Sequence, residues 1–141
     1  MTEGTGLSAT AEPDFSGWSP EKLYRHGLSA FNGGDFYDAH EYWEELWIGH
    51  RPWDRTFIQG LIQLAVGCFH LTNDNLKGGR GLFTKCRPKL EKGLPAGRGL
   101  DVAALLTFVD AALEQIESLS SAGDFDWSGL PVLAEPEAAE N

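Results

Sequence analysis

The sequence predicts an all-α protein, a compact bundle or array of about five helices in one domain. The chain of 141 residues has the length of a single domain with its tails. Apolar residues recur at helical spacing through most of residues 20–119, and helix-capping residues and glycines separate the periodic segments. The sequence contains no convincing strand alternation or hairpin turn. We therefore expect helices and no sheet.

The first two helices are expected over residues 20–32 and 36–48. Ser19 and Pro20 supply an N-cap and a first helical residue, and a pair of glycines ends the first helix. Asp35 is the expected N-cap of the second helix, which another glycine ends. An angular count of 100° per residue predicts an apolar core face on this second helix. That face carries Phe36, Ala39, Trp43, Leu46 and Trp47.

Three further helices are expected over residues 52–73, 76–91 and 102–119. The first of these is apolar almost all round, through FIQGLIQLAVGCFHL, so we expect it to be the central, buried helix. Pro88 is expected to kink the next helix or to end it early, because proline lacks the amide hydrogen. Asp101 is the expected N-cap of the last helix.

The chain ends are expected to lie outside a helical domain of residues 18–120. Residues 1–17 have almost no apolar content and residues 134–141 are rich in Ala and Glu, so we expect both to be disordered acidic tails. Residues 121–133 are too apolar for such a tail. We expect them to form an extended strap that packs on the domain.

The formal net charge of −10 arises mostly at the ends, since residues 1–19 and 120–141 hold eight acids and no base. A near-neutral centre without a basic stripe argues against nucleic-acid binding. No apolar run approaches the ~20 residues that span a membrane, and the N-terminal segment lacks the regions of a signal peptide. Two cysteines outside any metal-type spacing fit a reducing compartment. We expect a cytoplasmic protein that binds neither nucleic acid nor membrane.

His40 and Glu44 lie one turn apart on the same side of the second helix, at the border of its apolar face. Side chains at positions i and i+4 can ligate one divalent metal, and zinc, manganese or iron would suit this pair. The segment His-Glu-x-x-Glu differs from the zinc-protease motif at its second histidine. The alternative is a His–Glu hydrogen bond that only orients the imidazole.

A polar stripe runs along the otherwise apolar third helix. It consists of Arg55, Gln59, Gln63 and His70. Buried polar groups need partners, because an unpaired one costs about 1–3 kcal/mol. A short connection makes the second and third helices neighbours, so we expect this stripe to face His40 and Glu44. Two interpretations stay open: a polar ligand pocket between these helices, or a structural network that satisfies itself.

The fourth helix is basic, whereas the second helix carries five acids and no base. One interpretation is mutual attraction of the two helices across the bundle, and the other is an anion site around Asn75 and Lys77 at the start of the fourth helix. Cys68 is expected to be buried and inert. The lysine beside Cys86 does not by itself make a reactive thiol.

The run FNGGDFYDAHEYWEELW, followed by RTFIQGLIQLAVGCFHL and an Asn-containing turn, resembles a family of small bacterial, archaeal and plastid proteins, domain of unknown function 309. The resemblance covers about residues 20–92. The family pattern is met by Phe31, Asn32, Gly34, Ala39, His40, Glu41, Trp43, Glu44, Trp47, Gln59, Gly60, Leu61, Ile62 and Gln63, with Arg55 before and His70 after the last group. The resemblance implies a compact helical array similar to tetratricopeptide helix pairs. It implies no activity.

Three functions stay open, and the first is favoured because the polar positions coincide with the family pattern. In the first, the domain is a binding module for a small polar ligand or a divalent metal. Its pocket is lined by His40, Glu41, Glu44, Arg55, Gln59, Gln63 and His70. In the second, it is a metal-dependent or acid–base hydrolase, with His40 or Glu44 as the general base and Arg55 polarising the substrate. In the third, it is a helical protein–protein interaction scaffold with a purely structural polar network.

Overall fold

The computed structural model describes residues 14–136, so the disorder expected for residues 1–13 and 137–141 lies outside the described chain. Within residues 14–136 there are five α-helices and no strand, which confirms the all-α prediction. The α-helices are α1 (Pro20–Asn32), α2 (Phe36–Gly49), α3 (Arg55–Thr72), α4 (Leu76–Glu91) and α5 (Val102–Ser118). Short 3-10 turns follow as η2 (Gly97–Gly99), η3 (Ala122–Asp124) and η4 (Trp127–Gly129).

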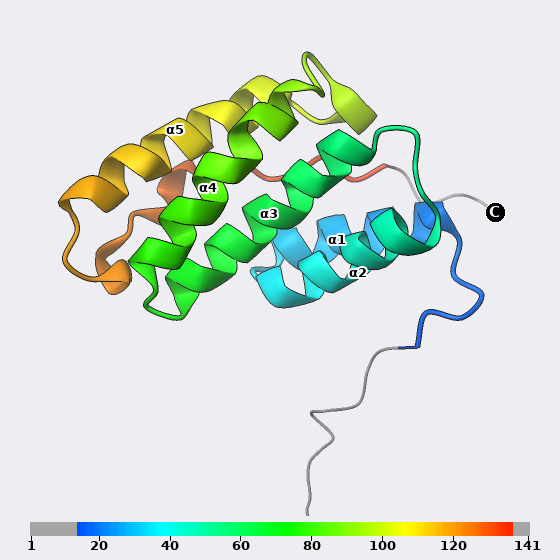
Figure 1. Cartoon of the computed structure of the whole chain (residues 1–141), viewed down its shortest axis with the longest axis horizontal. Helices are drawn as coiled ribbons and strands as arrows, with labels where there is room; N and C mark the ends of the chain where they lie inside the picture. Colours follow the sequence, from blue (N-terminus) through cyan, green and yellow to red (C-terminus); the bar gives the residue numbers. More distant parts are fainter. Residues whose placement is uncertain (1–13, 137–141) are drawn as a thin grey trace, which may run out of the picture.

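Successive helices pack side by side, so α2 lies against α1 and α3, and α4 lies against α3 and α5 (Figure 1). Connections of three residues join α1 to α2 and α3 to α4, and such short connections make the joined helices antiparallel neighbours. The molecule is therefore a compact array of helix pairs of the tetratricopeptide kind. The apolar helix α3 lies in the middle of this array, as its composition predicts.

Helix starts follow the capping residues of the sequence. Side-chain oxygens of Ser19, Asn75 and Asp101 each accept a hydrogen bond from the backbone N–H three residues further on, at 2.8–3.0 Å. Gly34 takes a φ of +84° in the turn between α1 and α2, a conformation that favours glycine. Asp35 occupies the N-cap of α2, but its carboxylate makes no capping hydrogen bond. That carboxylate is therefore free to face solvent or a ligand.

Helix α3 begins at Arg55, three residues later than the sequence predicts. Trp53 and Asp54 form a turn instead of a first helical turn. The carboxylate of Asp54 binds the guanidinium of Arg98 and makes no bond to the start of its own helix. A contact between distant parts of the chain thus decides where this helix begins.

Helix α4 runs from Leu76 to Glu91, as the sequence predicts, so of the two effects expected of Pro88 the early end of the helix does not occur. Leu90 is fully buried and packs against Gly60 of α3. Proline removes one backbone hydrogen bond, and this packing holds the last helical turn in place.

Trp43 joins α1 to α2 at the centre of the core. Its side chain is fully buried, and its indole Nε1–H donates to the backbone carbonyl of Tyr24, 3.2 Å away. The ring lies directly against Gly27, where a Cβ atom would overlap the indole. A glycine at position 27 is therefore required for the close approach of these two helices.

The described C-terminal segment returns across the array after α5 (Figure 1). Asn32 binds it at two points, because its side-chain amide donates to the carbonyl of Leu133 at 2.9 Å and accepts from the N–H of Leu133 at 2.8 Å. Trp127 stacks on Phe36, with ring centroids 5.6 Å apart. These contacts give Asn32 of the family pattern a structural role.

The residues before α1 also contact the array. Phe15 lies edge-on to Trp18, with centroids 5.4 Å apart, and Trp18 stacks on Tyr42 of α2 at 5.7 Å. The sequence predicts disorder as far as residue 17, and these ring contacts bring Phe15, inside that range, against the helices.

We expect Gly27→Ala to lower the free energy of unfolding by about 1–3 kcal/mol, because the added methyl group forces α1 and Trp43 apart. Gly81→Ala in α4 is the matched control, since no atom lies within 4 Å of its Cβ position. That control should gain about 0.5–1 kcal/mol from helix propensity. Urea unfolding followed by circular dichroism measures both changes, and equal effects would contradict this account of the α1–α2 contact.

Candidate functional site

His40 and Glu44 form the pair that the sequence predicts, at the edge of α2. Nε2 of His40 lies 3.4 Å from a carboxylate oxygen of Glu44, whose side chain is 49% exposed. Nδ1 of His40 lies 3.1 Å from the backbone carbonyl of Tyr37 and donates to it when it carries the proton. Metal-binding histidines commonly have such a carbonyl partner on the second nitrogen. Within residues 14–136, however, no group of three or more His, Cys, Asp or Glu side chains is arranged to hold a metal ion.

Arg55 stabilises the connection between α2 and α3. Its guanidinium donates to the backbone carbonyl of Trp47 at 2.7 Å and lies 4.1 Å from the centre of the Trp47 indole ring. In return, the indole N–H of Trp47 donates to the carbonyl of Arg55 at 3.0 Å. This reciprocal pair satisfies Arg55 at the start of the polar stripe and closes the turn between the helices.

His70, at the other end of the stripe, belongs to the turn between α3 and α4. Its Nδ1 lies 3.3 Å from the side-chain nitrogen of Asn75, whose oxygen caps α4. Gln59 and Gln63 lie between the two ends and are partly buried. The Oε1 atom of Gln63 is buried without a hydrogen-bond partner among the described residues. The stripe is thus engaged at both ends by the chain itself.

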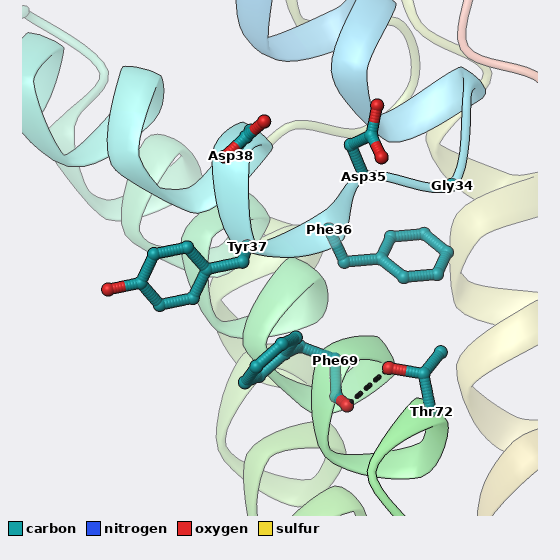
Figure 2. A pocket seen from close by; sticks show the side chains of 7 residues that line it. All are labelled: Gly34, Asp35, Phe36, Tyr37, Asp38, Phe69 and Thr72. Carbon is teal, nitrogen blue, oxygen red and sulfur yellow. Dashed lines mark hydrogen bonds between the residues drawn. The ribbon is translucent and has the colours of Figure 1, made fainter. Parts of the chain in front are cut away.

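A hollow of about 210 Å³ lies between the start of α2 and the end of α3 (Figure 2). We call it the α2–α3 hollow. It is lined by Gly34, Asp35, Phe36, Tyr37, Asp38, Phe69 and Thr72. None of the seven residues expected to line a pocket belongs to this set. His40 adjoins it through the ring of Tyr37, 5.1 Å away, and Glu41 lines a neighbouring hollow with Asp38.

Aromatic rings and carboxylates make up the chemistry of the α2–α3 hollow. The rings of Tyr37 and Phe69 have centroids 5.3 Å apart, and Tyr37 is 48% exposed. Figure 2 shows Tyr37 and Phe36 projecting to opposite sides of the start of α2, with Phe69 on the facing helix. The hydroxyl of Thr72 donates to the carbonyl of Phe69 at 2.7 Å, and its lone pairs remain available.

The field along this side of α2 is negative. The helix and its N-cap carry five carboxylates and no Lys or Arg. The charge of Glu41 above all, then burial, raises the pKa of Tyr37, with smaller effects from the charges of Glu44 and Asp38. The α2–α3 hollow therefore lies beside negative charge.

The sequence did not single out Tyr37 or Phe69. Both fall beside predicted polar residues, Tyr37 one turn before His40 and Phe69 next to His70. An aromatic residue at such a position is core or surface depending on what packs over it, and helical spacing alone does not separate the two.

Arg87 of the basic helix α4 pairs with α5 and not with the acidic α2. Arg87 binds both carboxylate oxygens of Asp110 in α5, at 2.7 and 2.9 Å, and also binds Glu91 within α4. Since α4 lies between α3 and α5, the attraction expected between α4 and α2 is replaced by this pairing. Asn75 uses its side chain to cap the helix, at the point where an anion site was considered.

Both cysteines are buried thiols, as expected for Cys68. Burial raises the pKa of Cys68 well above its usual value. Burial also raises the pKa of Cys86 to about 12, and the nearby charges of Lys89 and Arg87 offset only part of that effect.

The fold defines a small all-helical module with a polar and aromatic edge along α2. Residues 24–82, from α1 into α4, match the family model described as domain of unknown function, DUF309. This match confirms the resemblance to the family over residues 24–82. The chain is also 33% identical, over 90 residues, to the uncharacterized protein YpuF of Bacillus subtilis (strain 168).

That alignment covers 62% of this chain and 52% of YpuF, so the chain spans about half the length of its relative. No solved structure matches the chain. Among residues 14–136, no helix combines the length and the apolar composition needed to cross a membrane.

Arg55→Ala should lower the free energy of unfolding by about 1–3 kcal/mol, because it removes the hydrogen bond and the ring contact that close the α2–α3 connection. Glu44→Ala should cost less than about 1 kcal/mol, because Glu44 is exposed and its pair with His40 is screened by water. Chemical unfolding of the two variants beside the wild type measures the difference. A larger loss for Glu44→Ala would contradict the structural assignment of Arg55.

Neither thiol should react with the reagent DTNB at pH 8 in the folded protein, since both are buried and protonated at that pH. Both should react fully in guanidinium chloride. Absorbance of the released thionitrobenzoate counts the reactive thiols, and rapid labelling of one thiol in the folded state would show that its helix opens.

Proposed function

We propose that the domain is a binding module that recognises a cationic group, an ammonium or a guanidinium, in the α2–α3 hollow. One observation carries this proposal: the hollow is lined by the neighbouring rings of Tyr37 and Phe69 and by two acidic residues at the start of α2, a helix without Lys or Arg. The proposal narrows the small polar ligand of the binding-module hypothesis to a positively charged ligand.

Attraction to the cation has two sources. Tyr37 and Phe69 both line the hollow, with ring centroids 5.3 Å apart, and a cation over the face of such a ring gains about 0.5–1 kcal/mol at an exposed site. Asp35 and Asp38 are among the residues that line the same hollow, so their negative charges lie at its border, and Asp35 is not used as a helix cap. Carboxylates along a cleft also raise the local concentration of cations.

The metal and hydrolase alternatives receive less support from the same geometry. His40 and Glu44 have no third ligand of suitable type among residues 14–136. Arg55, which was to polarise a substrate, binds the carbonyl of Trp47. His70 lies beside Asn75 in the following turn. Arg55 and His70 are therefore engaged with other parts of the chain, and the pair of His40 and Glu44 stands without them.

The test is a nuclear magnetic resonance titration of the ¹⁵N-labelled chain with putrescine and with N-acetyl-argininamide, using acetate as the anionic control. Both cations should shift amide signals of Tyr37, Asp38 and Phe69, and acetate should not. Asp38→Asn should weaken binding about two- to fivefold, because it removes one carboxylate charge.

Three further variants distinguish the contribution of the Tyr37 ring from that of charge. Tyr37→Phe keeps the ring and should retain binding, whereas Tyr37→Leu should weaken it about two- to fivefold. Glu117→Gln removes an exposed charge from α5 that does not line the hollow, and should leave binding unchanged. Equal losses for Asp38→Asn and Glu117→Gln would reduce the effect to net charge and overturn the proposed site.

A further inference from the structure

A second hollow, of about 340 Å³, lies at the opposite end of the α2–α3 pair and is separate from the proposed cation site. The connection from α2 to α3 and the connection from α4 to α5 meet at this end of the array (Figure 1). We call it the Trp53 groove. It is lined by Trp53, Asp54, Phe57, Lys92, Gly93, Leu94, Pro95, Ala96 and Gly97.

The Trp53 groove has an apolar floor and an exposed aromatic wall. Phe57 is buried beneath it, and Gly93 and Gly97 lie so close to this ring that a Cβ at Gly93 would overlap it. Trp53 is 89% exposed and Leu94 is 48% exposed. An indole left in water beside an apolar hollow is the type of residue that dominates the energetics of protein interfaces.

Side-chain contacts hold in place the two connections that form the groove. Arg98, with a φ of +53°, binds both oxygens of Asp54 at 2.6 and 2.8 Å, and its guanidinium lies 4.8 Å from the centre of the Tyr24 ring. This ion pair ties the α4–α5 connection to the start of α3. The reciprocal bonds of Arg55 and Trp47 hold the connection that carries Trp53. A preformed groove reduces the entropy lost when a partner binds.

The two connections that form the groove carry a net positive charge, whereas the chain as a whole has a formal net charge of −10. Arg51 and Lys92 are exposed on the two connections that form it. Asp54 is the acid in the α2–α3 connection, and the bidentate bond to Arg98 neutralises it. The α4–α5 connection, residues 92–101, has no acid before Asp101. The rim of the groove is therefore complementary to carboxylates.

We propose that the Trp53 groove docks an acidic segment of another protein, which inserts a Leu, Phe or Trp side chain beside Trp53 and places Asp or Glu residues near Arg51 and Lys92. A hollow of this size and shape fits a side chain better than the flat surface of a bilayer. A two-fold contact between two copies of this face would bring the same cations together, which disfavours a second copy as the occupant.

The probe is a set of twelve-residue peptides that carry one central Phe flanked by Asp and Glu. Two control peptides replace the Phe by Ala, or the acids by Lys. Nuclear magnetic resonance of the ¹⁵N-labelled chain follows the indole N–H signal of Trp53, which is identified by its loss in Trp53→Ala. The acidic Phe peptide should shift this signal, and both control peptides should bind at least tenfold more weakly.

Matched variants test the two parts of the proposed interaction, which are the contact with Trp53 and the attraction of acidic residues to Lys92. Trp53→Ala should weaken the acidic Phe peptide about tenfold or more, whereas Val132→Ala, another exposed apolar residue, should leave its affinity unchanged. Lys92→Glu should weaken it severalfold, whereas Lys85→Glu on the exposed side of α4 should not. These substitutions are at exposed positions, so the variants are expected to fold.

Four results would each overturn the proposal. The first is the absence of any shift at millimolar peptide, and the second is equal binding of the acidic and lysine peptides. The third is a shift of the Trp53 signal with protein concentration alone, which would make a second copy the occupant. The fourth is broadening of that signal by phosphatidylglycerol vesicles without peptide binding, which would make a lipid surface the occupant.

Discussion

Trp43 fills a notch that is open only because residue 27 is a glycine, and this contact sets the distance between α1 and α2. The indole also donates to the carbonyl of Tyr24, so the position of α1 along α2 is set as well as its distance. Close-packed interiors tolerate little change in volume at such a point. The other helices pack one after another on this pair, beginning with α3 on α2.

Tyr24 connects the Trp43 contact to the proposed protein-docking end of the molecule. Its carbonyl receives the Trp43 indole, while its ring lies against the guanidinium that binds Asp54. Burial, opposed by the charge of Arg98, raises the pKa of the Tyr24 phenol, so this side chain stays neutral at physiological pH. The core and the Trp53 groove are thus joined by direct contacts, which is why the two connections that form the groove are held in place.

The polar residues of α2 and α3 show which contacts a sequence pattern predicts and which it does not. Helical spacing correctly predicted that His40 lies next to Glu44, because residues one turn apart on the same helix are neighbours whatever surrounds them. The same reasoning expected Arg55 and His70 to share a pocket with this pair. Arg55 instead bonds to Trp47 and His70 lies beside Asn75, because backbone carbonyls and capping groups at the helix ends are nearer partners. Those groups leave no periodic signal in the sequence.

The sequence by itself determined the helical class, the first helix, most helix caps and the apolar face of α2, because local propensity and spacing act within one helix. Only the tertiary structure decided where α3 begins, which of the outcomes expected at Pro88 was excluded, and which aromatic side chains stay exposed. Asp54 and Arg98 are 44 residues apart, and Tyr37 and Phe69 meet across two helices. Such contacts depend on how the helices pack, and helix packing depends on the volumes and shapes of side chains throughout the core.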